Sequence, residues 1–152
     1  MRINIIAVGR SAKSDETALV DRYFSRLSWQ CKMIEVEEKR PLPPLQLMEK
    51  EAGLLLAAVP KNSVMVAMDG RGNMLSSEKL ATKFEQWQQT GHSIISFLIG
   101  GADGLHKNVL GRADYTLSLG TMTWPHLLVR AMLAEQIYRA STILSGHPYH
   151  RS

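Results

Sequence analysis

Cysteine is almost missing from this sequence, since Cys31 is the only one among 152 residues. A lone thiol excludes a disulfide within the chain and is typical of a protein of the reducing cytoplasm. A chain of this length buries a sufficient core in one domain without metals or cross-links. We therefore expect a single cytoplasmic domain over residues 1–152, with Cys31 as a core side chain.

Long apolar runs are missing as well. The run within MRINIIAVG (residues 1–9) is closed by a polar stretch too early to form the apolar segment of a signal peptide. No other run approaches the length of a membrane span. The sequence also has no single-residue or Ser/Pro-rich tract, which excludes the composition typical of disordered proteins. We expect a globular protein that does not associate with a membrane.

The motifs of several common sites are also absent. There is no G-x-x-x-x-G-K-[ST] loop, and IGGADGL (residues 99–105) lacks the G-x-G-x-x-G spacing of a dinucleotide site. His147 and His150 have no carboxylate or cysteine near them in the C-terminal tail, so we predict no metal site. A G-x-S-x-G elbow for acyl transfer is missing too.

Short apolar runs alternate with segments of helical period along the whole chain. Runs of strand length, most of them apolar on both faces, lie at residues 3–8, 33–36, 64–68, 94–99 and 115–119. Helical spacing of apolar residues lies at about residues 19–27, 47–58, 80–87, 102–110 and 125–144. This alternation predicts an α/β fold with a mainly parallel sheet and helices on both faces.

Two loops lead from a predicted strand into a predicted helix. IGGADGL has three glycines, which let a backbone approach a ligand closely. SLGTMTWPH (residues 118–126) offers free backbone groups beside apolar Met122 and Trp124, a combination suited to an adenine ring. Each loop alone is equally compatible with a plain turn. Together they favour a ligand site, because open α/β sheets bind small molecules at the carboxyl edge.

The last 27 residues hold three of the five histidines of the chain. Chain ends are normally frayed and built from dispensable polar residues. A tail rich in proton-transfer and cationic side chains therefore predicts that it forms part of a site. For Glu135 and Arg139, four residues apart on a predicted helix, a plain surface ion pair is the alternative interpretation.

Four segments together closely resemble the RlmH family of SPOUT-class methyltransferases, over the whole chain. They are AVG (residues 7–9), IGGADGL, TMTWPHLLVRAMLAEQIYRA (residues 121–140) and the terminal HPYHR (residues 147–151). The resemblance implies a dimeric α/β-knot protein with a C-terminal trefoil knot. It also implies transfer of a methyl group from S-adenosyl-L-methionine to N3 of a pseudouridine in 23S ribosomal RNA, on the assembled ribosome.

The resemblance further implies which residues form the site. The cofactor-binding residues would be Met68, Gly101, Gly120, Thr121, Met122, Thr123, Trp124 and Pro125. The catalytic and substrate side would consist of His126, Arg130, Glu135, Tyr138, Arg139, Tyr149, His150 and Arg151. Trp124 departs from the family pattern, in which a smaller aliphatic residue or phenylalanine is expected.

These residue types suit methylation of a weakly acidic nitrogen. N3 must lose its proton before or during attack on the methyl group, so cations near the oxygens of the base and a general base both help. Arg139 and Arg151 are the candidates for anion stabilisation and phosphate contact, His150 is a candidate base, and Tyr149 is a candidate stacking group. The sequence leaves the identity of the base open. In such dimers the tail of one protomer would complete the pocket of the other.

Two other functions stay open. One is a non-catalytic ribosome-associated module that uses a basic surface, because lysine and arginine exceed the acidic residues by 18 to 14. The other is a SPOUT methyltransferase that acts on transfer RNA. Apolar residues of the last helix outside its predicted buried stripe, Leu127, Leu128 and Ile143, predict a homodimer joined through that helix.

Overall fold

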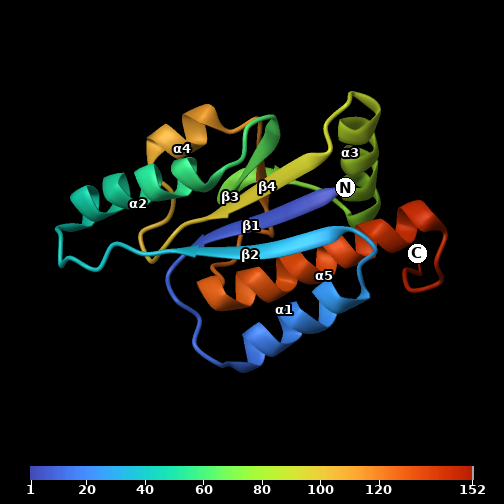
Figure 1. Cartoon of the computed structure of the whole chain (residues 1–152), viewed down its shortest axis with the longest axis horizontal. Coiled ribbons are helices and arrows are strands. Elements are labelled where there is room, and N and C mark those ends of the chain that lie inside the picture. Colours follow the sequence, from blue (N-terminus) through green and yellow to red (C-terminus); the bar gives the residue numbers. More distant parts are fainter. Residues whose placement is uncertain (152) are drawn as a thin grey trace.

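The computed structural model describes residues 1–151 and shows a five-stranded sheet between two layers of helices (Figure 1). The strands are β1 (Arg2–Val8), β2 (Gln30–Val36), β3 (Ser63–Met74), β4 (Ile94–Ile99) and β5 (Tyr115–Ser118). The helices are α1 (Asp15–Arg26), α2 (Pro44–Ala58), α3 (Ser77–Gln89), α4 (Lys107–Arg112) and α5 (His126–Ser145). The strands are parallel and follow the order β2-β1-β4-β3-β5, which confirms the predicted fold class. The C-terminal knot stays a prediction.

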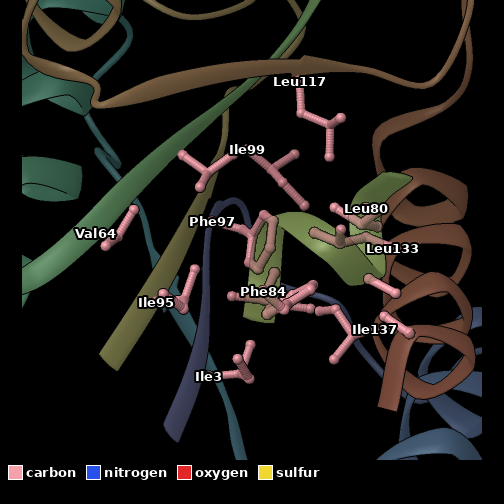
Figure 2. Packing of buried hydrophobic residues seen from close by; sticks show 14 of the residues in the cluster. Ile3, Val64, Leu80, Phe84, Ile95, Phe97, Ile99, Leu117, Leu133 and Ile137 are labelled. Carbon is pink, nitrogen blue, oxygen red and sulfur yellow. The ribbon is translucent and has the colours of Figure 1, made fainter. Parts of the chain in front are cut away.

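The sheet has a separate apolar core on each face. On one face, side chains such as Ile3, Phe97 and Phe84 pack together with α3 and α5 (Figure 2). On the other face, Ile6 and Leu98 pack against α2 and α4. Neighbouring residues of β1 and β4 are thus buried on opposite faces, which explains why these strands are mostly apolar on both faces, with Asn4 and Ser96 as a buried polar pair. In the part of the chain that the structure describes, no helix has the length and apolar character needed to cross a membrane.

Several elements begin earlier than predicted, such as β2 at Gln30 instead of residue 33, but the two largest differences lie at the carboxyl edge. β3 runs on to Met74 instead of ending at Met68, because its polar second half pairs with the edge strand β5 and needs no apolar faces. α4 begins at Lys107 instead of residue 102, because residues 100–104 form a closed turn first. We name residues 100–104 the glycine turn.

The apolar residues expected to form a dimer surface on α5 are half-buried within the protomer. Leu127 lies beside α1, and Ile143 packs against the core shared by α3 and α5. The exposed large apolar side chains of the described chain include Met74 at the end of β3 and Met122 and Trp124 in the connection that follows β5. The homodimer stays a prediction, and these loops rather than the middle of α5 offer apolar surface for it.

Candidate functional site

A cavity of about 450 Å³ opens at the carboxyl edge of β3, β4 and β5. Its wall consists of the end of β3, the glycine turn, the first turn of α5 and the loop between β5 and α5, which we name the β5–α5 loop (residues 119–125). All the residues expected to bind the cofactor line this cavity except Pro125, which is the N-cap of α5. The structure therefore brings the expected cofactor residues together at one place.

The first two residues of the glycine turn are closely packed against their surroundings. A Cβ atom on Gly100 would lie 2.6 Å from the carbonyl carbon of Gly104, and Gly104 itself has a left-handed φ of +82°. A Cβ atom on Gly101 would lie 3.1 Å from Glu51 Oε2 and 3.2 Å from Val8 Cγ1. Because the turn closes on its own backbone and rests on α2, only glycine gives it this shape.

The β5–α5 loop folds back on itself beside the cavity. Gly120, with a φ of +112°, donates its N–H to Ser118 Oγ at 3.1 Å. The Trp124 indole N–H donates to the carbonyl oxygen of Leu119 at 3.3 Å. Met122 is exposed, so the loop offers free apolar surface at the cavity. Trp124, the residue that departs from the family pattern, is held by its own loop rather than by the core.

Glu51 of α2 lies behind the glycine turn and was not predicted from the sequence. Its carboxyl group is buried, with the residue only 9% exposed. Burial first, and the nearby negative charge of Asp103 second, raise the pKa of Glu51 above the ordinary value of a glutamate. The sequence gives no indication that Glu51 lies next to the cavity wall, because it stands within an ordinary amphipathic helix.

α5 connects the cavity to the N-terminal half of the sheet. His126, at its start, lines the cavity, whereas Arg130, one turn later, is 2% exposed and does not. Arg130 forms an ion pair with Glu35 of β2 and donates to the carbonyl oxygens of Val8 at 3.0 Å and Gly9 at 2.9 Å. In this structure Arg130 therefore fixes the chain after β1 and is not directed at the cavity.

The pKa of Glu35 reflects this arrangement. Partial burial acts to raise it, but hydrogen bonds from Ser11 and the Arg130 guanidinium outweigh burial and hold it below the ordinary value. Glu35 is thus an anion that satisfies a buried cation. The pair anchors the start of α5, and with it His126, to β1 and β2.

The remaining expected catalytic residues cluster around the tail. Tyr149 donates its hydroxyl to Glu135 Oε1 at 3.0 Å, and its ring packs edge-on against Tyr138 with centroids 4.7 Å apart. Arg139 forms an ion pair with Glu135 and lies 4.8 Å from the centre of the Tyr149 ring. Arg151 is exposed at the end of this cluster. The ion pair considered for Glu135 and Arg139 is present, but as part of a larger network.

His150 links the tail cluster to α3. Its Nδ1 lies 3.1 Å from Arg139 Nη1, and its Nε2 lies 2.8 Å from Glu78 Oε1. Because a guanidinium only donates, Nδ1 must accept and Nε2 carries the hydrogen that Glu78 accepts. Glu78 is a further partner that the sequence did not predict, since its distance along the chain gives no hint of the contact.

Apart from Arg130, the expected site residues thus form two separate groups within one protomer. From His126 at the cavity to Arg139 in the tail cluster, α5 advances 13 residues, or roughly 20 Å at the rise of an α-helix. A second depression of about 540 Å³, lined in part by Glu135 and by Ser76 at the start of α3, adjoins the β5–α5 loop. Within residues 1–151 no cluster of histidine, cysteine and acidic side chains could hold a metal ion.

Comparison with known proteins gives consistent matches over the full chain. A family model described as predicted SPOUT methyltransferase matches residues 1–150. Proteins named ribosomal RNA large subunit methyltransferase H from Rhodospirillum centenum and Paramagnetospirillum magneticum are 49% and 50% identical, over 100% and 99% of this chain and of their own lengths. The protein of the same name from Rhodospirillum rubrum is 48% identical over 100% of both chains.

Solved structures support the fold alone. A probable methylase family protein from Haemophilus influenzae has a TM-score of 0.54 at 12% identity, with 99% of this chain and 70% of that chain covered. A protein whose structure was described for 2-OH methylation of C/U34 on tRNA has a TM-score of 0.53 at 19% identity, covering 95% and 97%. The full-length match of the family model and of close relatives confirms the resemblance seen in the sequence, and the chain belongs to the SPOUT methyltransferase family.

Proposed function

We propose that this chain methylates N3 of a pseudouridine in 23S ribosomal RNA and uses S-adenosyl-L-methionine as methyl donor. The observation that carries the proposal is the full-length identity of 48–50% to proteins named as large-subunit ribosomal RNA methyltransferases. The choice of N3 of a pseudouridine rests on the resemblance to the RlmH family. Because ribosomal RNA is in the cytoplasm of a bacterium, the proposed substrate places this protein in the cytoplasm.

The cavity suits the adenosyl part of the cofactor. Leu119, Met122 and Trp124 provide apolar surface, and the glycine turn and the β5–α5 loop provide backbone donors and acceptors beside it. Flat apolar rings with polar edges are held by this combination. When bound, the cofactor supplies a methyl group on a positively charged sulfur, which needs no metal ion for transfer.

The tail cluster suits the opposite partner, the base. Arg139 and Arg151 place positive charge where an anionic base would be stabilised. Burial, followed by the hydrogen bond to Glu135, raises the pKa of Tyr149 to about 12, so this phenol stays neutral and acts as an orienting donor or stacking group. His150 becomes a base only when its contact with Arg139 opens, because Nδ1 is the ring nitrogen that carries no hydrogen, and Arg139 occupies it.

The separation of the two groups supports a homodimer. None of the residues of the tail cluster lines the cavity of its own protomer. A second copy, placed with its tail cluster at this cavity, would complete the site by symmetry. The exposed Met122 and Trp124 at the cavity rim provide apolar surface for such a contact.

The test is methylation of ribosomal particles from a bacterial strain that lacks the endogenous enzyme. The purified protein and labelled S-adenosyl-L-methionine should add one methyl group to a 23S pseudouridine, located by mass spectrometry of nuclease fragments. Methylation of transfer RNA instead would replace the proposed substrate with the alternative one. If neither methylation nor saturable cofactor binding is found, the non-catalytic ribosome-associated module is the function that remains.

A further inference from the structure

β3 carries an insertion at the rim of the cavity. Met68 and Asn73 both pair with Leu117 of β5, so residues 69–72 loop out of the sheet between them. We name residues 69–72 the β3 bulge. Bulges of this kind redirect side chains next to active sites. Residues 69–71 also line the cavity together with the β5–α5 loop.

The β3 bulge is fixed from several sides. Ser118 Oγ donates to the carbonyl oxygen of Gly70 at 3.2 Å, and Asn73 Nδ2 donates to that of Thr116 at 3.1 Å. A Cβ atom on Gly72 would lie 2.7 Å from Thr116 Cγ2, so glycine is needed for the close approach of the two strands. These contacts therefore hold the backbone of the bulge, and with it the side chains at the cavity rim, in a fixed position.

The side chain that it presents is Arg71. Asp69 accepts from the Arg71 backbone N–H at 2.8 Å and from Nε and Nη2 at 3.0 Å each. The hydrogen bond from the Arg71 side chain is the main cause that holds the pKa of Asp69 below its ordinary value, so the pair is ionic. The Arg71 side chain is 81% exposed, and within residues 1–151 its Nη1 has no hydrogen-bond partner. One edge of the guanidinium is thus oriented by Asp69 while the other faces solvent.

Arg71 is the permanent cation of this cavity. Of the residues lining it, the titratable ones are Asp69, Arg71 and His126. A small cofactor is held mainly by groups that it buries, whereas Arg71 stands in solvent at the rim. An RNA nucleotide that enters the cavity brings its flanking phosphates over that rim, and arginine edges pair well with phosphate.

We propose that Arg71 binds a phosphodiester of the RNA next to the nucleotide that is methylated. This inference rests on the proposed function. Asp69 and the stiff bulge orient the guanidinium before the RNA arrives, which lowers the entropy cost of the contact. Arg71 is a substrate-positioning group and takes no part in proton transfer.

The test compares Arg71→Gln with Arg40→Gln. Arg40 is a matched control because it pairs with Glu38 through the same three donors, is 62% exposed, and does not line the cavity. Arg71→Gln should raise KM for ribosomal particles about tenfold, with kcat and the Kd of S-adenosyl-L-methionine unchanged. The slope of the logarithm of the particle binding constant against the logarithm of the salt concentration should decrease in magnitude by about one. Arg40→Gln should change none of these quantities.

Arg71→Lys separates phosphate binding from a structural role. Lysine loses the paired contact with Asp69 but keeps the charge, so most of the affinity for particles should return. Equal loss in the glutamine and lysine variants would show that the ion pair only supports the bulge. Weaker cofactor binding in Arg71→Gln would assign the contact to the cofactor carboxylate instead. Particle binding is measured without turnover, so the test of Arg71 stays separate from failure of the wild type to methylate.

Discussion

Two buried charged residues near the site differ in how their charge is satisfied. Arg130 has Glu35 and two carbonyl oxygens as partners, so its burial fixes the chain after β1. Glu51 lies behind the glycine turn with Asp103 as a second acidic group nearby. Loss of a partner is costly for a buried charge, whereas removal of an unfavourable charge is not. The two residues should therefore respond to substitution in opposite ways.

Glu51→Gln should stabilise the protein at neutral and alkaline pH. Because the pKa of Glu51 is raised in the fold, its favourable contribution is complete below the ordinary glutamate pKa and is lost as pH rises through the folded value. The free energy of unfolding of the variant should be about 1 kcal/mol higher than that of the wild type at pH 8 and equal to it at pH 4. Urea unfolding at both pH values measures this. The exposed Glu49→Gln on the same helix is the control, and an equal gain at both pH values would contradict the explanation.

At the scale of elements, the glycine turn between β4 and α4 is a closely packed part of the cavity wall. Gly100→Ala forces the turn open, because the new methyl group would meet the backbone of Gly104 and Leu105 within 2.9 Å. We expect the affinity for S-adenosyl-L-methionine, measured by calorimetry, to fall at least about tenfold, with a stability loss of about 1–3 kcal/mol. Gly111→Ala in α4, with no atom within 4 Å of the new methyl group, is the control. Unchanged cofactor affinity in Gly100→Ala would show that the turn is not part of the cofactor site.

The tail is the second element whose role is separable. Removal of the chain from Tyr149 onward deletes the contacts with Glu135, Arg139 and Glu78 but leaves the cavity wall intact. Cofactor affinity should stay within about tenfold, and methyl transfer to ribosomal particles should fall at least about 100-fold. Tyr149→Phe keeps the ring but loses the hydroxyl contact. Its rate of methyl transfer should lie between those of the truncated and the intact enzyme. A truncated protein that transfers methyl groups at the normal rate would exclude a catalytic tail.

The sequence predicts regular elements well and irregular ones poorly. β4 is predicted at its observed bounds, because five of its six residues are apolar and the strand is buried on both faces. The second half of β3 and the late start of α4 were missed, because hydrogen bonding to an edge strand and a closed glycine turn leave no periodic signal. These two irregular segments form part of the cavity wall.

The site residues, like the elements, differ in how well the sequence predicts their positions. The residues expected to bind the cofactor, except Pro125, line one cavity because they sit at strand ends and in the loops that follow strands, and their role in binding stays a prediction. Arg71 lies three residues after the end of the predicted strand 64–68, so its place at the carboxyl edge was a usable signal that was not taken up. The contacts of Glu51 and Glu78 are set by packing between elements distant in sequence, which one sequence does not reveal.

At the scale of the whole molecule, the proposed site needs two protomers. If the tail of one chain serves the cavity of the other, two differently inactivated variants should restore activity when mixed. Gly100→Ala supplies an intact tail, and the protein truncated before Tyr149 supplies an intact cavity. After unfolding and refolding together in equal amounts, half of the dimers are hybrids with one complete site each, so about a quarter of wild-type activity should return. Separate refolding followed by mixing on ice is the control, and no recovery after joint refolding would place each tail at its own cavity.

The strand order also determines when the chain can fold during synthesis. β1 leaves the ribosome first but lies between β2 and β4, and Asn4 contacts Ser96 across 92 positions of sequence. β5, which forms part of the cavity edge, pairs with β3 only after a further twenty or so residues have been made. Contacts this distant in sequence slow folding, because loop closure must precede their gain. Until β4 has been made, β1 of the nascent chain can pair with β2 on one edge only, and its other edge stays open. Folding therefore depends on protection of that open edge until β4 arrives.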